Sequence, residues 1–360
     1  MNIRLDFIKA FRDARRRRDI WHYELSKVEC CATGKVLVTF FRKCARFTAL
    51  VMCLLAICPK ADAQLYQPNR VRIGLAGRNF SFLPFFVAEQ QKFFEQEGIR
   101  AEMIYMRSPV AIPALSAGEI QYTTHFASVV RSAVKGFPVR VVLSTSDRQM
   151  FSLVTAKSIK RIEDLKGKAV AVSNPLGIHA YVTLQILKKF GLDPGKDPRF
   201  LYLGEESAWV SAMETGLVAG AFIQPPTSLV LKRKGYNLLV NAGDHIELPV
   251  TGLSTSVERM QKNSEEVKAV LRSIYRGLRF IKENREGSVK MIMKFLRVEP
   301  AVAEETYDLS AKYLSDTGVS SEHAVQAAIE NLGGAADAKI ESSTVADFNL
   351  LKEVIKTSRR

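Results

Sequence analysis

The sequence predicts an α/β fold with largely parallel sheets, followed by a helical C-terminal segment. Between residues 70 and 223, short strand-like runs alternate with amphipathic stretches, the rhythm of strand–helix–strand units. Beyond Ser256 the strand signals stop, and five stretches show the apolar spacing of helices. The 360 residues give room for two domains or one large one, and the 47% hydrophobic content suits a globular protein.

The alternation begins with a strand at 70–77 and a helix at 84–98, which has Pro84 in its first turn and Gly98 as its stop. Further elements follow in the same manner. We expect strands at 99–106, 122–125, 139–145, 150–156, 169–172 and 219–223, and helices at 110–118, 127–136, 162–167 (one turn), 181 onward and 209–216.

The C-terminal helices are expected at 264–284, 287–296, 300–314, 320–332 and 345–356. In the first of them one apolar stripe is visible. It consists of Val267, Val270, Leu271, Ile274, Leu278 and Ile281. The basic residues between them are interpreted as a solvated face. They are Lys268, Arg272, Arg276, Arg279 and Lys282.

The net charge of +15 is unevenly distributed. Residues 1–63 hold 13 Lys/Arg and 6 Asp/Glu, so about half of the excess lies in the first 63 residues. A nucleic-acid-binding protein needs a localised basic face with base-reading elements, and the remaining sequence shows none. We therefore expect no nucleic-acid partner.

All five cysteines precede residue 59, which excludes a disulfide framework, a cysteine metal site or a catalytic thiol beyond that point. We also expect no bound metal and no cofactor, because no metal-ligand or nucleotide motif occurs.

The segment from Phe40 to Gln64 has the order of a secretory signal peptide. Basic residues 42–46 precede the apolar run 47–58, and Ala61-Asp62-Ala63 follows as a cleavage site. Residues 1–63 are thus predicted to be a signal peptide with a long basic N-terminal extension, cleaved near Ala63. The alternatives are an uncleaved signal anchor and a lipoprotein modified at Cys58, although Ile57 is large for the position before a lipidated cysteine.

Polar residues recur where the predicted strands end. In an open parallel sheet, ligands bind beyond the carboxyl ends of the strands, where helix N-termini offer free N–H groups. Asn174 is predicted as an N-cap with Pro175 at the first helical position, and Gly177 lets a ligand approach the backbone. Five such corners together indicate a hydrogen-bonding pocket. They are 79–81, 123–125, 144–146, 173–177 and 224–225.

Three stretches of the chain resemble a known family. They are "PFFVAEQQKFFEQEGIRAEMI", "AIPALSAGEIQYTTHFASVVRSAVKGFPVRVVLST" and "SIKRIEDLKGKAVAVSNPLGIHAYVTLQILKKFGLDP". Together they look like the nitrate/sulfonate/taurine-type substrate-binding proteins of ABC importers, over roughly residues 70–330. The resemblance implies the two-lobed periplasmic-binding-protein type II fold with a ligand cleft between the lobes.

Carried over to this chain, the resemblance implies a first lobe of residues 70–148 and 253–360 and a second lobe of residues 149–252. The crossings lie at Arg148–Ser152 and Leu248–Leu253. The resemblance also implies that strand-end loops contact the ligand. The residues at these positions are Asn79, Phe80, Ser81, Thr123, His125, Ser146, Ser173, Asn174, Gly177 and Gln224.

The same scaffold also houses enzymes, including a pyrimidine synthase of thiamine biosynthesis that uses a cysteine-rich iron motif. The body of this chain has no cysteine, and no HExxH, GxSxG or P-loop pattern occurs, so we expect no enzyme. His179 is either a ligand donor beside the 173–177 corner or a solvent-facing residue of the first helical turn.

The sequence thus predicts the periplasmic solute-binding component of an ABC importer, a monomer that delivers a small molecule to a permease in the inner membrane. A polar or anionic solute such as a sulfonate or nitrate is expected, because helix N-termini attract anions and the corners show no carboxylate. The alternatives are an exported enzyme, a sensor domain on the same scaffold, and a binder of a pyrimidine-like thiamine precursor.

Overall fold

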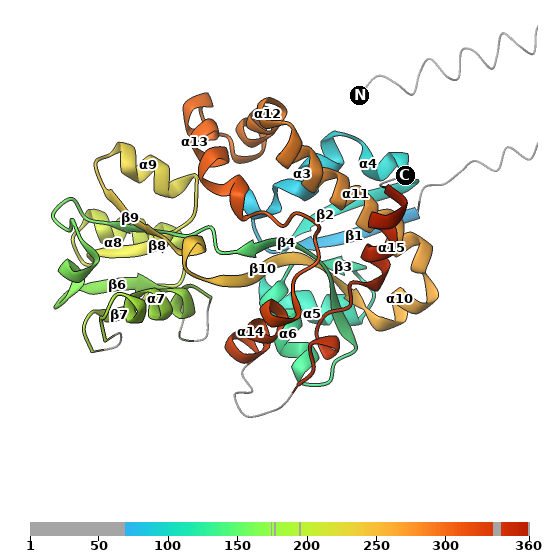
Figure 1. Cartoon of the computed structure of the whole chain (residues 1–360), viewed down its shortest axis with the longest axis horizontal. Coiled ribbons are helices and arrows are strands. Elements are labelled where there is room, and N and C mark those ends of the chain that lie inside the picture. Colours follow the sequence, from blue (N-terminus) through green and yellow to red (C-terminus); the bar gives the residue numbers. More distant parts are fainter. Residues whose placement is uncertain (1–68, 174, 176–177, 194–195, 334–339, 359–360) are drawn as a thin grey trace, which may run out of the picture. The chain divides into compact units, whose positions relative to one another are not determined.

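The computed structural model describes residues 69–358 except 174, 176–177, 194–195 and 334–339, and it contains two five-stranded sheets (Figure 1). The predicted leader at 1–63 lies outside the described residues. Within the part of the chain that is described, no helix has the length and hydropathy needed to span a membrane.

Sheet A has the strand order β2-β1-β3-β10-β4. β1 pairs in parallel with β2 and β3, and β10 pairs antiparallel with β3 and β4. The strands are β1 Asn69–Leu75, β2 Ile99–Tyr105, β3 Tyr122–Thr123, β4 Val139–Arg148 and β10 Glu247–Ser256.

Sheet B has the order β7-β6-β8-β5-β9. β6 pairs in parallel with β7 and β8, while β5 is antiparallel to β8 and β9. Gly220 is required where β8 meets β5, because a Cβ there would lie 2.8 Å from the carbonyl oxygen of Val154. The strands are β5 Ser152–Thr155, β6 Ala169–Val172, β7 Arg199–Tyr202, β8 Gly220–Ile223 and β9 Asn237–Asn241.

The helices that pack with sheet A define lobe A, and most of their bounds lie near the predicted ones. The predicted helix 84–98 breaks into α3 and α4 at Lys92, which has a left-handed φ of 57°, and the helix at Val257–Lys262 was not predicted. The helices are α3 Leu83–Gln90, α4 Phe93–Gln96, α5 Ser108–Ser116, α6 Phe126–Val134, α10 Val257–Lys262, α11 Ser264–Glu283, α12 Arg285–Leu296, α13 Pro300–Ser310, α14 Glu322–Leu332 and α15 Asn349–Ser358.

The helices that pack with sheet B define lobe B. They are α7 Ile178–Lys189, α8 Glu206–Glu214 and α9 Thr227–Arg233. The prediction that Pro175 is the first residue of α7 is wrong, because Pro175 lies in a turn and the helix begins at Ile178. Short 3-10 helices connect the elements, at Phe80–Phe82, Ile162–Leu165, Ala242–Asp244, Ala311–Tyr313 and Ser342–Thr344.

The apolar core is divided between the two lobes. One large cluster fills lobe A, and two smaller ones lie in lobe B, one with α7 and the other with α8 and α9. The neighbours Met150 and Phe151 belong to different lobes' clusters, so the chain passes from one core to the other between them. α7 also contributes to the lobe A core through Ile178 and Tyr181.

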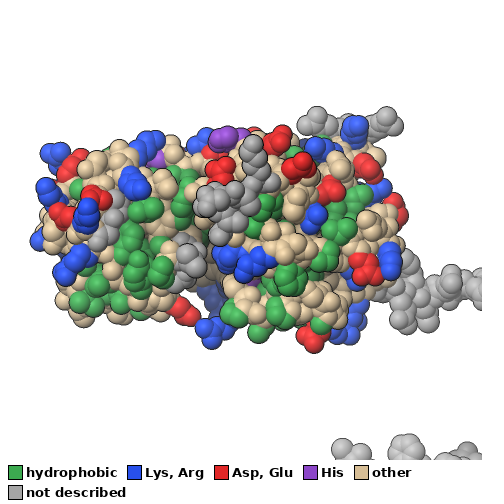
Figure 2. Space-filling model, turned by 90° about the horizontal axis from the view of Figure 1, so that it is seen from below, with side chains coloured by type: hydrophobic (Ala, Val, Ile, Leu, Met, Phe, Trp, Pro, Cys, Tyr) green, Lys and Arg blue, Asp and Glu red, His purple; other side chains and the backbone are tan. Residues whose placement is uncertain are grey.

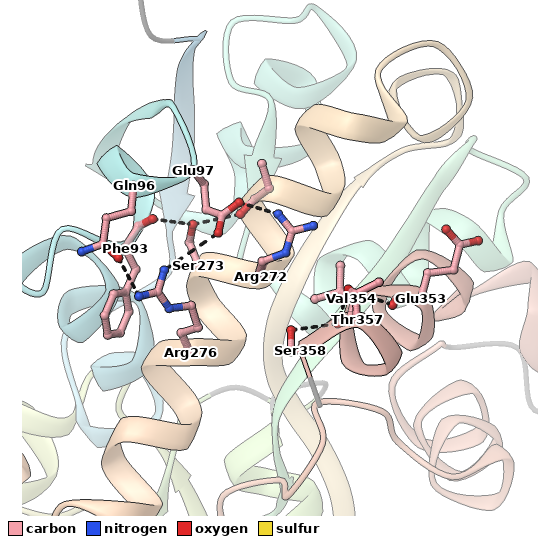
Figure 3. Close-up of polar contacts among 11 residues, drawn as sticks. Phe93, Gln96, Glu97, Arg272, Ser273, Arg276, Glu353, Val354, Thr357 and Ser358 are labelled. Atoms are coloured by element: carbon pink, nitrogen blue, oxygen red, sulfur yellow. Dashed lines mark hydrogen bonds and ion pairs between the residues drawn. The ribbon is translucent and has the colours of Figure 1, made fainter. Parts of the chain in front are cut away.

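The apolar stripe predicted on α11 is buried along its length, as expected. The basic side chains between its members are not simply solvated. Figure 3 shows Arg272 paired with Glu97 and Arg276 reaching Gln96, and Arg276 also stacks 4.1 Å from the centre of the Phe93 ring. The ion pair, the hydrogen bond and the ring contact each join α11 to α4 or its last turn, so together they hold the two helices side by side.

Candidate functional site

The pairing directions bring the carboxyl ends of both parallel strand groups to the junction between the lobes. β1, β3 and β4 run the same way, since β10 is antiparallel to β3 and β4, and the chain leaves β4 toward sheet B. β5 enters sheet B antiparallel to β8, so β6 and β8 end where β5 begins (Figure 1). This is the edge at which open α/β sheets bind ligands.

The corner after β1 is internally satisfied. The Asn79 side chain accepts a hydrogen bond from the Ser81 backbone N–H at 3.0 Å and so caps the 3-10 helix that follows. Phe80 is 1% exposed and belongs to the lobe A core. The Ser81 hydroxyl donates to the sulfur of Met150 at 3.5 Å. Phe80 therefore packs in the lobe A core next to this corner, and the Asn79 side-chain oxygen and the Ser81 hydroxyl already have hydrogen-bond partners.

The corner after β3 is also satisfied. His125 Nε2 lies 3.0 Å from the carbonyl oxygen of Met106 and must donate to it. Nδ1 of a neutral ring then accepts from the Thr123 hydroxyl at 2.8 Å. Burial lowers the pKa of His125, which favours this neutral form. Both ring nitrogens are therefore used within the protein.

The third predicted corner in lobe A, which contains Ser146, differs from the other two. The Ser146 side chain is fully buried on β4, and the hydroxyl has no hydrogen-bond partner among the described residues. The hydroxyl of Ser144, two residues earlier on the same strand, is also buried without a partner among the described residues.

The corner after β6 carries unpartnered polar groups. Ser173 follows β6 directly, and its buried hydroxyl has no partner in the described part of the chain. The predicted contacts Asn174 and Gly177 lie outside the described residues. Gln224 follows β8, the neighbour of β6 in the sheet, and its side chain is half-buried. Ser173 and Gln224 are therefore brought to one edge of sheet B.

Three aromatic rings from three elements form a layer beyond this edge, which we call the aromatic layer. It consists of Phe151 before β5, His179 in α7 and Trp209 in α8, with His179 4.5 Å from Phe151 and 4.7 Å from Trp209 between ring centres. α7 and α8 pack on opposite faces of sheet B, so their side chains can meet only past the ends of the strands. Burial lowers the pKa of His179 to about 4, so the ring is neutral at neutral pH.

Trp209 contributes more than its ring. The residue is 2% exposed, and its indole N–H finds no acceptor among the described residues. The sequence treated His179 as a donor or as solvent-facing, and the structure places it between two aromatic side chains. Phe151 and Trp209 were missed, because rings 58 residues apart reveal no common site in the sequence.

Glu206 is a further residue that the sequence analysis missed. Its carboxyl accepts a hydrogen bond from the Gln224 backbone N–H at 3.4 Å and another from the Thr227 side chain. Burial raises its pKa, which these two hydrogen bonds only partly oppose. The expectation that the corners contain no carboxylate is therefore wrong. Glu206 could have been found as a polar residue at a strand end, because it follows the end of β7 by four residues. It was missed because β7 was not predicted.

Two polar contacts connect the chain segments that pass between the lobes. The Gln149 side-chain amide donates to the carbonyl of Leu248 at 2.8 Å, and Arg148 donates to the carbonyl of Gly243 at 3.0 Å. A Cβ on Gly243 would collide with the carbonyl of Gln149 and with the Tyr313 ring. Gly243 therefore packs against the segment at Gln149 with no room for a side chain.

The C-terminal helices also reach lobe B. Glu305 of α13 pairs with Arg233 of α9 at 2.7 Å and lies 3.7 Å from Lys232. Asp244 accepts from Lys312 and from the Tyr313 hydroxyl, each at 2.8 Å. A groove of about 400 Å³ lies between α9, β9 and α13.

The described residues include no cluster of three or more His, Cys, Asp or Glu side chains that could hold a metal ion.

The comparisons with known proteins agree with this fold. Residues 79–288 match the protein family described as NMT1/THI5 like. A curated relative, the riboflavin-binding protein RibY of Chloroflexus aurantiacus, is 24% identical over 246 residues, which is 66% of this chain and 70% of that protein.

Two solved structures share the fold at low sequence identity. The periplasmic aliphatic sulphonate binding protein SsuA of Escherichia coli has a TM-score of 0.66 and 18% identity, over 78% of this chain and 92% of that chain. The periplasmic nitrate-binding protein NrtA of Synechocystis PCC 6803 has a TM-score of 0.63 and 12% identity, over 80% and 89%. The predicted periplasmic-binding-protein type II fold is confirmed, as is the resemblance to binding proteins of the nitrate/sulfonate type.

Proposed function

Because the chain belongs to the NMT1/THI5-like family, as its match over residues 79–288 shows, we propose that it is the extracytoplasmic solute-binding component of an ABC importer. Lobe A and lobe B close around a small solute by a hinge motion at the crossings. The loaded form then docks on a permease in the inner membrane.

One observation supports the proposal most directly. Both strand groups end at the junction between the lobes, and the lobe B side of it holds two buried polar atoms, Ser173 Oγ and Trp209 Nε1, that have no partner among the described residues. Buried polar groups are almost always hydrogen-bonded, and leaving them unpaired costs free energy. A solute that accepts from these groups removes that cost, and binding of this kind requires no catalytic group.

The aromatic layer indicates the shape of the solute. Phe151 and Trp209 are packed into the lobe B core with His179 between them, and together they would form an apolar floor beneath this edge, while the unpartnered atoms receive polar groups of the solute. We therefore propose a small organic solute, a class that includes aryl or alkyl sulfonates and pyrimidine-like rings.

The remaining features follow from this role. We propose that the protein is exported by the leader within residues 1–63, acts in the periplasm as a monomer, and divides into residues 70–148 and 253–360 as one lobe and 149–252 as the other. On the face drawn in Figure 2, basic and acidic side chains are interspersed, which does not favour a nucleic-acid partner.

The proposal is tested by identifying what copurifies with the protein by mass spectrometry and measuring its affinity by calorimetry. Trp209→Phe removes the indole N–H and keeps an aromatic ring, so we expect roughly tenfold weaker binding. Because the smaller ring leaves a cavity at this buried position, the melting temperature should fall as well. Tyr202→Phe is the matched control, because Tyr202 is 52% exposed and should leave the affinity unchanged.

Equal affinities of the Trp209→Phe and Tyr202→Phe variants would remove the aromatic layer from the site. Chemical conversion of the bound compound during incubation would replace the receptor by an enzyme on the same scaffold.

A further inference from the structure

We propose that Glu206 selects solutes by charge: its carboxyl receives an N–H or cationic group of the solute and excludes anionic groups from the lobe B side of the site. The inference rests on the proposed function and deepens it, since it names which members of the small organic class are bound.

The position of Glu206 supports this role. It is the first residue of α8, and Trp209 of the aromatic layer lies one turn later on the same side of the helix. Its carboxyl lies beside the backbone N–H of Gln224, at the end of β8. Since Ser173 ends the neighbouring strand β6, the carboxyl belongs to the same edge as the unpartnered hydroxyl and indole.

The partly buried carboxylates of this protein have two kinds of partner. Glu97 and Glu266, whose side chains are 16% and 10% exposed, each pair with an arginine, whereas Asp147 is hydrogen-bonded to the neutral hydroxyls of Ser315 and Ser320. Among the described residues, no Lys, Arg or His nitrogen lies within 4.0 Å of Glu206, which has only the neutral donors Gln224 N–H and Thr227. A buried acid without a cation is unfavourable in the free protein.

A ligand provides the missing partner. A protonated amine or an N–H group of the solute can donate to the carboxyl, which then ionises with a charge-assisted hydrogen bond. A sulfonate or carboxylate at the same place meets either a like charge or a carboxyl that must first be held neutral, in surroundings of low dielectric constant. Glu206 therefore discriminates against the anionic solutes that a bare helix N-terminus would attract.

A purely structural role of Glu206 predicts that the charge of the solute does not matter. A glutamate in the first turn of a helix interacts favourably with the helix dipole, and it would do so whatever the solute. The neighbouring Glu205 precedes α8 and is exposed, and its side chain makes no capping hydrogen bond. Glu205→Gln is therefore a matched control that removes a negative charge at the same helix end.

The test uses three probes with one ring in common: benzylamine, which is protonated at neutral pH, benzyl alcohol and benzenesulfonate. Calorimetry gives the dissociation constant of each probe for the wild type, Glu206→Gln and Glu205→Gln. We expect the wild type to bind benzylamine about tenfold or more tightly than benzenesulfonate, and Glu206→Gln to reduce that ratio by about tenfold. Glu205→Gln should change the ratio by less than about twofold.

Each possible calorimetric result supports or contradicts either the charge selection by Glu206 or the solute site itself. A wild type that binds benzenesulfonate as tightly as benzylamine overturns the charge selection, and this arm needs no variant to fold. An unchanged ratio in a folded Glu206→Gln protein, or an equal change in Glu205→Gln, also overturns it. Failure of all three probes to bind the wild type contradicts the proposed solute site itself.

Discussion

The corners after β1 and β3 in lobe A and the corner after β6 in lobe B contain similar residue types but differ in how their polar groups are satisfied. In lobe A, Asn79 caps its own turn, and the Thr123 hydroxyl, the His125 ring and the Met106 carbonyl form a closed chain of hydrogen bonds. The exception in lobe A is β4, where the Ser144 and Ser146 hydroxyls are buried without a partner among the described residues. In the described part of lobe B, Ser173 Oγ and Trp209 Nε1 are buried without partners, and no cationic nitrogen lies within 4.0 Å of Glu206.

This difference indicates that the satisfied and the unpartnered groups have different roles. Groups that are satisfied in the free protein contribute to folding stability, whereas unsatisfied groups lower it and gain only when a ligand arrives. The corners after β1 and β3 are then a preformed wall, and Ser146 of lobe A joins the unpartnered groups of lobe B as a candidate for selective contacts. Substitutions of satisfied groups should therefore lower mainly the stability, and substitutions of unpartnered groups should lower mainly the affinity for the solute.

The largest effect is expected in the core of lobe A. Phe80→Ala removes a ring that is 1% exposed, so the free energy of unfolding should fall by about 3–5 kcal/mol, measured by urea denaturation. The equivalent change at exposed Phe137 should cost far less, because its ring is 48% exposed. A Phe80→Ala protein of native stability that fails to bind solute would place Phe80 in the site and contradict the comparison.

A pair of isosteric or smaller changes compares the two corners directly. Thr123→Val leaves His125 Nδ1 buried without a donor, so we expect a loss of about 1–3 kcal/mol of stability. Ser173→Ala removes a hydroxyl that has no partner, so stability should hold while solute affinity falls by roughly tenfold. Melting curves and calorimetry on the same samples separate the two effects, and a reversed pattern would invert the proposed roles of the lobes.

The pH dependence of stability tests the state of Glu206. Its pKa is raised in the folded protein, so the folded state keeps its proton to a higher pH than the unfolded chain, whose glutamates titrate near about 4.3. The wild type therefore loses stability as the pH rises through the folded pKa. Glu206→Gln should gain stability relative to wild type at about pH 8 but not at about pH 4, as measured by thermal unfolding.

The control is Glu205→Gln, because Glu205 lies at the same helix end, is exposed and makes no capping hydrogen bond. A Glu206→Gln protein that is less stable than the wild type at every pH would show that the carboxyl serves mainly to hold the Gln224 corner together.

The smallest effect is expected where α9 of lobe B meets α13. Glu305→Arg replaces the partner of Arg233 by a like charge, which should weaken solute binding by at most a few fold, since exposed ion pairs contribute about 0.2–1 kcal/mol. The double variant Arg233→Glu with Glu305→Arg should restore the affinity. Single and double variants with equal affinity would mean that this pair does not contribute to lobe closure.

Much of the fold could be predicted because its signals are local. α11 was expected at 264–284 and lies at Ser264–Glu283, since a 20-residue apolar stripe needs only its own periodicity to be recognised. The break between α3 and α4 was not predicted, because it depends on the left-handed residue Lys92 and on contacts with α11 that come from residues 170 or more positions away. The short strands β7 and β9 were missed for lack of a clear alternating pattern.

By itself the sequence determined the alternation of strands and helices, the helical C-terminal segment and the placement of polar residues at strand ends, because each depends on neighbours within a few positions. The tertiary structure alone decided which of those polar residues are already satisfied. His125 and His179 illustrate this: one ring is held by Thr123 and Met106, and the other lies between Phe151 and Trp209. The physical reason is that a hydrogen bond or a ring contact needs a partner in space, and at these corners the partners come from other elements of the chain.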